Sequence, residues 1–282
     1  MMDLTSPAVV RELIGRYGFS FTKSLGQNFI TSRSALDRML DAAALDAETG
    51  VLEIGPGIGT LTRELSARAA RVAAVEIDRA LLPLLSETLA DCGNVQVYHA
   101  DALTLDLPAF CRDALPCRRL AVCANLPYYI TTPAVTMLLE SGLFSQITLL
   151  LQREAAERLC ALPGEDSYCA VSAIVRLFAK PQLLFRVPAD CFIPRPKVAS
   201  AVLSLSPLDR GLSPEQKDRT LAVLRAAFAQ RRKTLLNTLS AAELCDREQA
   251  LSAIRACGFR DDVRGEALRA EDFILLAAAL SE

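Results

Sequence analysis

The chain has 282 residues, which suits one large domain or one domain with a small appendage, and it can bury a sizeable core without disulfide or metal support. Its 31 Lys and Arg residues and 33 Asp and Glu residues leave a net charge of −2, with a sequence pI of about 5.7. This balance excludes a globally basic nucleic-acid binder but not a local basic patch. Apolar residues at 51% and charged residues at 23% are typical of a globular protein and exclude a disordered one.

Short apolar runs alternate with helical patterns through the first half of the chain. The predicted strands cover residues 51–54, 72–77, 95–99, 120–125 and 147–152, with helical patterns at 60–69, 79–90 and 133–141. Apolar strands that alternate with helices indicate a parallel sheet covered on both faces. Two later runs, 182–187 and 198–205, have a shorter connection and predict an antiparallel edge. The predicted fold class is therefore α/β, with a Rossmann-like, mostly parallel sheet and antiparallel edge strands.

The pattern changes after residue 206, because only helical periodicity follows. Ser213 is placed as the N-cap of a helix, with Pro214 at its first position and Gln216 completing a capping box. Residues 206–214 have the composition of a linker. We therefore predict a main domain over residues 1–206 and a small all-helical domain over residues 207–282.

The first residues show no basic segment followed by an unbroken apolar run, so we expect no signal peptide. No stretch of 18 uncharged apolar residues is present, and we expect no membrane span. The nine cysteines include no C-x-x-C pair, and the chain has a single histidine. These features predict reduced thiols, no metal and a cytoplasmic location.

A glycine-rich loop, EIGPGIG at 53–59, follows the first predicted strand and opens a helix. Glycines there let the backbone turn tightly and approach a ligand, although structural turns of this composition are common. Glu76 ends the next strand, where an acid can accept from both ribose hydroxyls of an adenosine, and Asp101 follows the third strand. Because Glu53 precedes the glycines, the loop suits a cationic ligand better than a pyrophosphate. We therefore favour the sulfonium of S-adenosylmethionine over a dinucleotide.

The segment Asn125-Leu126-Pro127-Tyr128 follows the fourth predicted strand. An exocyclic adenine amine is a poor nucleophile, and two acceptors on its hydrogens can aim its lone pair at a methyl donor. The side-chain oxygen of Asn125 and the carbonyl of Leu126 can supply these acceptors, while Pro127 stiffens the loop and Tyr128 can stack on the base. Alone, the segment is equally compatible with a proline turn that caps a buried strand. After a methyl-donor loop at this spacing, the functional interpretation is favoured.

Taken together, these motifs make the chain similar to the small-subunit ribosomal RNA adenine dimethyltransferase family, which dimethylates two adjacent adenines near the 3′ end of that RNA. The similarity covers nearly the whole chain. Its segments are LGQNF (25–29), VLEIGPGIGTLT (51–62), AVEID (74–78), NLPYYITTP (125–133), QREAAERL (152–159), FIPRPKVASAVLSL (192–205) and AFAQRRKTLLNTL (227–239). The resemblance implies a class I methyltransferase sheet, S-adenosylmethionine as donor, no metal and a role in small-subunit biogenesis.

The resemblance also implies roles for individual residues. Those implied to bind the donor are Asn28, Ile30, Gly55, Glu76, Asp101 and Asn125, and Gly57 is assigned to the donor as part of the glycine-rich loop. Those placed at the reacting centre are Asn125, Leu126, Pro127 and Tyr128. Two departures stand out: Tyr129 occupies a position where many members have Asn, and Cys169 follows Tyr168 where glycine is usual.

A local basic patch is proposed for RNA. Between Arg219 and Lys233 every charged residue is basic, and Arg225 and Arg232 are seven apart, which predicts one helical face. The residues predicted to contact RNA phosphates are Arg195, Lys197, Arg225, Arg231, Arg232 and Lys233. A solvated helix face is the ordinary alternative for such a charge run.

The predicted activity is transfer of methyl groups from S-adenosylmethionine to the N6 amine of two adjacent adenines in small-subunit rRNA. The expected partner is the small ribosomal subunit or its rRNA, with no membrane involved, and we expect a monomer. One alternative is a sister enzyme that dimethylates a large-subunit rRNA adenine and confers antibiotic resistance, although its members are typically strongly basic. The other is a ribosome assembly factor with little catalytic role.

Overall fold

The computed structural model describes residues 2–22, 25–230 and 232–280. Contacts divide the chain into two compact units. The first comprises residues 1–156 and 181–207, and the second comprises residues 157–180 and 208–282. Each unit has its own hydrophobic interior, and each is described below by itself.

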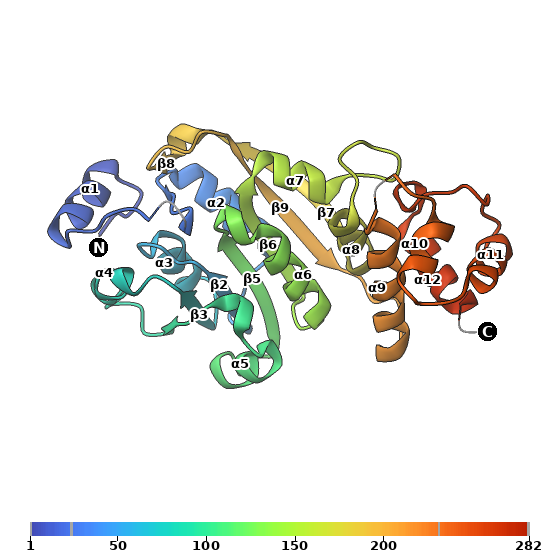
Figure 1. Cartoon of the computed structure of the whole chain (residues 1–282). Coiled ribbons are helices and arrows are strands. Elements are labelled where there is room, and N and C mark those ends of the chain that lie inside the picture. Colours follow the sequence, from blue (N-terminus) through green and yellow to red (C-terminus); the bar gives the residue numbers. More distant parts are fainter. Residues whose placement is uncertain (1, 23–24, 231, 281–282) are drawn as a thin grey trace. The chain divides into compact units, whose positions relative to one another are not determined.

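The first unit is built on a seven-stranded sheet with the order β4-β3-β2-β5-β6-β9-β7 and helices on both faces (Figure 1). The strands are β2 (Thr49–Ile54), β3 (Arg71–Glu76), β4 (Val95–His99), β5 (Arg119–Asn125), β6 (Gln146–Gln152), β7 (Ala179–Val187) and β9 (Ser200–Pro207). The pairs β4–β3, β3–β2, β2–β5 and β5–β6 are parallel, and β6–β9 is antiparallel. The predicted parallel sheet with an antiparallel edge is confirmed.

Helices α1 to α6 belong to this unit, and α7 is divided equally between the two units. Their bounds are α1 (Pro7–Arg16), α2 (Arg33–Ala42), α3 (Thr60–Ser66), α4 (Leu82–Thr88), α5 (Leu107–Ala114), α6 (Thr131–Ser141) and α7 (Arg153–Cys160). Leu36 and Met39 of α2 and Leu61 of α3 pack against Val51 and Cys123 of the sheet. Glu53 shares the face of Val51 and lies at the carboxyl end of β2.

A second, two-stranded sheet joins distant parts of the first unit. Strand β1 (Phe29–Ile30) pairs antiparallel with β8 (Phe192–Ile193), with Phe29 opposite Ile193 and Ile30 opposite Phe192. Residues 25–30, which we call the strap, are thereby held at the carboxyl ends of the main strands. This pairing is too short to produce a periodic pattern, and the sequence analysis did not predict it.

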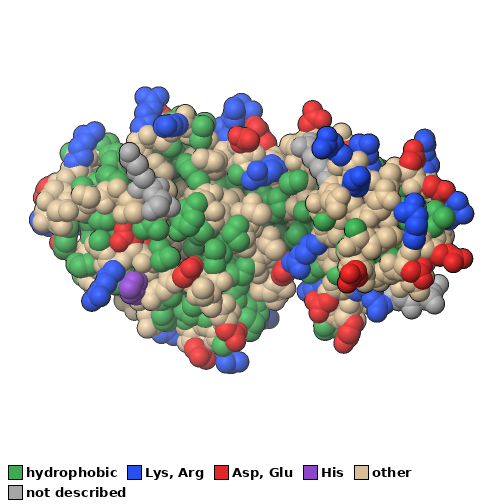
Figure 2. Space-filling model, in the orientation of Figure 1, with side chains coloured by type: hydrophobic (Ala, Val, Ile, Leu, Met, Phe, Trp, Pro, Cys, Tyr) green, Lys and Arg blue, Asp and Glu red, His purple; other side chains and the backbone are tan. Residues whose placement is uncertain are grey.

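The second unit is helical. It contains α8 (Ala170–Phe178), α9 (Pro214–Phe228), α10 (Leu235–Ala241), α11 (Arg247–Ala256) and α12 (Ala270–Ala279). The predicted start of α9 is confirmed, because Ser213 Oγ accepts from the Gln216 amide and Gln216 Oε1 accepts from the Ser213 amide. On the face shown in Figure 2, acidic and basic side chains are intermixed over the helices of this unit.

Two features of the helical region differ from the sequence analysis. Residues 157–180, predicted as part of the first domain, cluster with the helical unit, because α8 buries seven of its nine residues and packs against α9 and α12. The single helical face predicted for Arg225 and Arg232 is wrong, because α9 ends at Phe228 and α10 begins only at Leu235. At the start of α10 the Leu235 amide donates to the carbonyl of Val263 at 2.7 Å.

Among the described residues, no helix is long and apolar enough to span a membrane. All nine cysteines are free thiols. Within the described part of the chain, no three His, Cys, Asp or Glu side chains gather as metal ligands do.

Candidate active site

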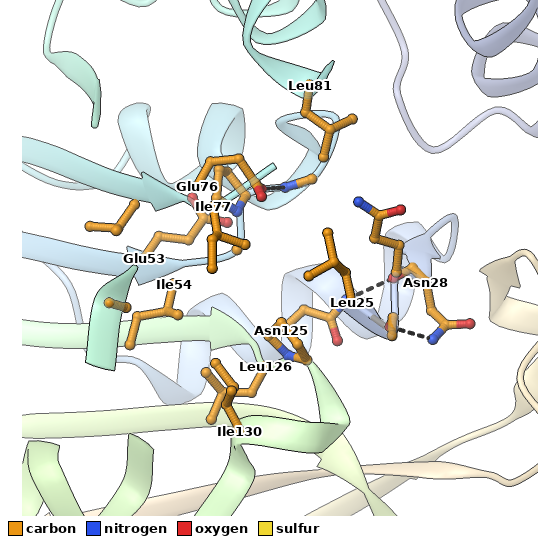
Figure 3. A pocket seen from close by; sticks show the side chains of 18 of the residues that line it. Leu25, Asn28, Glu53, Ile54, Glu76, Ile77, Leu81, Asn125, Leu126 and Ile130 are labelled. Atoms are coloured by element: carbon orange, nitrogen blue, oxygen red, sulfur yellow. Dashed lines mark hydrogen bonds between the residues drawn. The ribbon is translucent and has the colours of Figure 1, made fainter. Parts of the chain in front are cut away.

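A pocket lies at the carboxyl ends of β2, β3 and β5, with the strap along one side (Figure 3). It is lined by all the residues that the sequence analysis assigned to the donor and the reacting centre: Asn28, Ile30, Gly55, Gly57, Glu76, Asp101, Asn125, Leu126, Pro127 and Tyr128. Among the described lining residues the charged groups are Glu53, Glu76 and Asp101, and none is Lys or Arg. The pocket therefore favours a cation over an anion.

The glycine loop lines the floor of the pocket with left-handed backbone. Gly55, Gly57 and Gly59 have φ values of 73°, 61° and 86°, which side-chain-bearing residues rarely adopt. At Gly57 the constraint is doubled, because an added Cβ would lie 2.9 Å from Cδ1 of Phe29 in the strap. Only glycine lets the loop and the strap approach this closely.

Glu76 ends β3 and connects the loop to the strand edge. Its side chain is 5% exposed, Oε1 accepts from the Asp78 amide at 2.8 Å, and Oε2 accepts from the Gly57 amide at 3.3 Å. Burial raises the pKa of Glu76 to about 7, and the two backbone donors act in the opposite direction. The carboxyl is thus fixed in position and retains lone pairs for ligand hydroxyls.

Glu53, at the end of β2, is a site residue that the sequence analysis treated only as a nearby charge. It is 1% exposed, and its Oε2 has no hydrogen-bond partner among the described residues. Burial raises its pKa to about 8, while the neighbouring Thr62 hydroxyl lowers it and the Glu76 carboxylate raises it further. An acid in a strand that is otherwise buried and apolar was the sequence signal for this role.

Asp101 follows β4 and stands at the same edge. One of its oxygens, Oδ1, accepts from the Leu103 amide at 2.9 Å and caps the short helix Ala102–Thr104. Tyr129 also lines the pocket, and burial together with the charges of Asp101 and Glu76 raises the pKa of its hydroxyl. Tyr129 is nevertheless 51% exposed, which places its ring at the mouth.

The segment 125–128 leaves β5 and turns back towards the strap. The Asn125 Nδ2 donates to the carbonyl of Asn28 at 2.9 Å, which leaves Oδ1 as the amide atom able to accept from a ligand. The Leu126 amide is bonded to the carbonyl of Leu150 at 2.9 Å, which anchors the loop on β6. The Tyr128 hydroxyl is paired with Ser200 Oγ at 2.9 Å, so its ring is held in a single orientation.

The strap is fastened by side chains as well as by β1. The Gln27 Nε2 donates to Asp78 Oδ2 at 2.6 Å, and its Oε1 accepts from the Thr22 amide at 2.9 Å. The Asn28 Nδ2 donates to the carbonyl of Gly26 at 2.8 Å, and Ile30 is buried in the core beside α2 and α3. Gln27 was missed as a positioning residue, because a polar residue in a loop gives no signal of its partner 51 positions away.

The candidate RNA-contacting residues fall in both units. Arg195 and Lys197 are exposed in the first unit, and Arg225, Arg232 and Lys233 are exposed in the second. Arg231 lies outside the described residues.

Comparison with known proteins shows the family to which the chain belongs. The model for "Ribosomal RNA adenine dimethylase" matches residues 18–281. The chain belongs to the ribosomal RNA adenine dimethylase family. A relative in this family, the ribosomal RNA small subunit methyltransferase A of Alkaliphilus oremlandii, is 40% identical over 285 residues, covering 100% of this chain and 99% of that protein. The protein of the same name from Geobacillus thermodenitrificans is 41% identical over 286 residues, covering 99% and 97%.

Solved structures agree with this membership of the adenine dimethylase family. A dimethyladenosine transferase from Plasmodium falciparum has a TM-score of 0.74 at 26% identity, covering 88% of this chain and 95% of that one. The 23S rRNA methyltransferase ErmE has a TM-score of 0.67 at 26% identity, covering 90% and 99%. The shared fold therefore includes most of both units of this chain.

Proposed function

We propose that this protein transfers methyl groups from S-adenosylmethionine to the N6 amine of two adjacent adenines near the 3′ end of small-subunit rRNA. The observation that carries the proposal is the pocket itself, in which the Asn125 amide and the 125–128 loop share one space with three carboxyl groups. Relatives about 40% identical over their full length, named small subunit methyltransferases, support the substrate. The ErmE structure, at 26% identity, is a more distant match to the large-subunit alternative.

The residues present fit the donor. Glu76 offers oxygens for ribose hydroxyls, and Asp101 retains Oδ2 for the amine of the donor's adenine. Glu53, whose Oε2 has no partner among the described residues, lines a cavity that has no described Lys or Arg, which suits a positively charged ligand. Asn28 and Gly55 shape the space by backbone contacts and by the missing Cβ, and Ile30 lines the pocket while it packs in the core.

The reaction assigned to this site is a direct transfer. When bound, S-adenosylmethionine supplies a methyl carbon on a positively charged sulfur; the adenine nitrogen's lone pair bonds to that carbon while the carbon–sulfur electrons pass to sulfur. Asn125 Oδ1 and the Leu126 carbonyl accept from the amine hydrogens and orient the lone pair, and Tyr128 packs on the base. The amine proton becomes acidic as the bond forms and leaves to water. The acceptors stabilise the positive charge that develops on nitrogen.

Each unit has exposed cations that are candidates for contacts with RNA. Arg195, Lys197, Arg225, Arg232 and Lys233 are candidates for phosphate contacts, which position RNA without selecting its sequence. The partner is then the small ribosomal subunit or its rRNA. A role in its biogenesis, a cytoplasmic location and a monomeric state remain predictions.

The decisive experiment measures methyl incorporation into small subunits that lack these methyl groups, with the modified nucleotides identified and mapped. We expect N6,N6-dimethyladenosine at two adjacent positions. Asn125→Ala should lower the transfer rate by about a hundredfold or more, because it removes an acceptor aimed at developing charge. It should also weaken donor binding by up to about tenfold, since the bond to the Asn28 carbonyl is lost.

Three outcomes would contradict the proposal. Methylation of a large-subunit adenine would favour the sister enzyme. Donor binding to immature subunits without turnover would favour an assembly factor. Unchanged turnover by Asn125→Ala would remove the role assigned to that side chain.

A further inference from the structure

Glu53 is the most deeply buried acid of the pocket, and its environment is unusual for a carboxylate. It is 1% exposed, and its Oε2 lacks a hydrogen-bond partner among the described residues. The Thr62 hydroxyl, also fully buried, is the polar side chain beside this carboxyl that favours its charged form. A buried carboxylate with neither a cation nor a full set of donors is strongly disfavoured, so the neutral acid is the stable form while no cation is present.

The groups that face Glu53 reinforce this preference. From β3 comes Glu76, whose negative charge raises the pKa of Glu53, and from α3 comes Thr62, whose hydroxyl lowers it. From β5 comes Cys123, a fully buried thiol whose own pKa is raised by burial and by Glu53. Arg68, beyond the end of α3, acts on Cys123 but is not among the groups that shift Glu53. Burial outweighs the hydroxyl, and the pKa of Glu53 is raised to about 8.

We propose that Glu53 is a proton-linked counter-charge for the methyl donor: neutral in the empty pocket, ionised when a sulfonium enters, and reprotonated once methyl transfer has removed that charge. This inference rests on the proposed function. Its direct support is the location of Glu53 in the same pocket as Glu76 and Asn125, at the end of the neighbouring strand (Figure 3).

The proton balance follows from the charges. When the donor binds, the Glu53 O–H bond breaks, the electron pair stays on the carboxylate oxygen and the proton goes to solvent. After transfer the sulfur is an uncharged sulfide, and Glu53 takes a proton back from solvent. The carboxylate attracts the charged donor but not the neutral sulfur of the product, so the linkage favours exchange of product for fresh donor.

The test is calorimetric titration of the whole protein at pH 7 with S-adenosylmethionine and, separately, with S-adenosylhomocysteine. Each titration is repeated in phosphate and in Tris, whose ionisation enthalpies differ, so that the heat reports protons released. We expect about one proton released per donor bound and clearly fewer per product. Both ligands also carry an α-amino group, which the nearby sulfonium makes more acidic in the donor than in the product. Its contribution is therefore separated from that of Glu53 by the variant Glu53→Gln and not by the comparison of the two ligands.

Glu53→Gln keeps the shape of the side chain and removes its proton. In this variant the number of protons released on donor binding should fall by about one. In the wild-type protein the donor affinity should rise with pH by up to about tenfold per unit below pH 8, and this rise should largely disappear in the variant. Glu248→Gln, an exposed acid on α11, is the matched control and should behave as wild type. Thr62→Val is a second variant, expected to move the midpoint of proton release to higher pH because a group that lowers the pKa is lost.

The outcomes separate this inference from the proposed function. Donor binding without proton release in the wild-type protein overturns the role of Glu53 and leaves the methyltransferase assignment intact. Equal proton release by Glu53→Gln and wild type overturns it as well. Failure of the protein to bind S-adenosylmethionine at any pH overturns both.

Discussion

At Gly57 the absence of a Cβ decides how closely the strap can approach the glycine loop. The residue has a φ of 61°, its amide donates to Glu76, and the ring of Phe29 lies where a methyl group would be. Sequence analysis could place a glycine at this turn from its spacing. It could not identify Phe29 as the neighbour, because the contact depends on the pairing of β1 with β8.

Gly57→Ala is expected to weaken donor binding at least about tenfold, since left-handed backbone costs about 1–2 kcal/mol for an L-residue and the clash with Phe29 displaces the strap. Equilibrium binding of S-adenosylmethionine measures this. The matched control is Gly211→Ala, which has a similar φ of 64° but open space around the added methyl group. It should lose comparable stability and keep wild-type donor affinity. Equal binding by both variants would mean that the Phe29 contact is unimportant.

The strap is the element whose position makes the pocket a closed site. Its contacts with the rest of the first unit include two β1–β8 residue pairs, the Asn125–Asn28 bond and the Gln27–Asp78 bond. Because the strap pairs with only one two-residue strand, it is expected to open locally more readily than the central strands of the sheet do. Donor exchange should therefore depend on the Gln27–Asp78 bond.

Gln27→Ala should speed donor dissociation by about tenfold, because a hydrogen bond to a carboxylate contributes about 1.5–3 kcal/mol. Gln27→Glu should have a larger effect, since it places a second carboxylate against Asp78. Stopped-flow displacement of the donor gives both rates. Gln146→Ala, which loses a 2.7 Å bond to Ser204 between β6 and β9, is the control and should leave the dissociation rate unchanged.

The main elements could be predicted because their signals are local. Each of the strands β2 to β6 is an apolar run, and the Ser213 capping box defines the start of α9 without any tertiary information. Predictions failed where contacts between residues far apart in the sequence determine the structure. The separate helix α10 begins with a bond from the Leu235 amide to the carbonyl of Val263, a partner 28 positions away, and the assignment of α8 to the helical unit depends on its contacts with α9 and α12. The residues of the reacting centre were predicted from motifs. The roles of Glu53 and Gln27 became visible only in the structure, which shows the burial of Glu53 and the hydrogen-bond partners of Gln27.

At the scale of the whole molecule, the near-zero net charge conceals opposite local environments. Most carboxyl groups are exposed and many are paired with arginines; Arg63, for example, lowers the pKa of Asp91 to about 2. In contrast, Glu53 and Glu76 are buried together with raised pKa values. The fold therefore tolerates two uncompensated acids in its first unit, which is explicable if a cationic ligand normally occupies their pocket.

The free energy of unfolding should depend on pH because of these two buried acids. A carboxyl whose pKa is raised on folding stabilises the protein fully below its unfolded value of 4.5, and that contribution is lost as the pH rises to about 7 for Glu76 and about 8 for Glu53. The Asp91 contribution has the opposite sign: it is present above pH 3.8 and is lost as the pH falls to about 2. Between pH 5 and 8 the buried pair dominates, so the ligand-free protein should become less stable as the pH rises.

Scanning calorimetry suits this measurement, since the chain has no Trp for fluorescence. We expect the Tm of the ligand-free protein to fall by several degrees from pH 6 to pH 8, because one pKa unit is about 1.4 kcal/mol and 1 kcal/mol moves Tm by about 2–4 °C at this size. Glu53→Gln should flatten the fall, and saturating S-adenosylmethionine should reverse it in the wild type but less in the variant. A Tm that rises with pH in both proteins would show that the buried acids are ionised without a ligand, and would remove the electrostatic basis for the role given to Glu53.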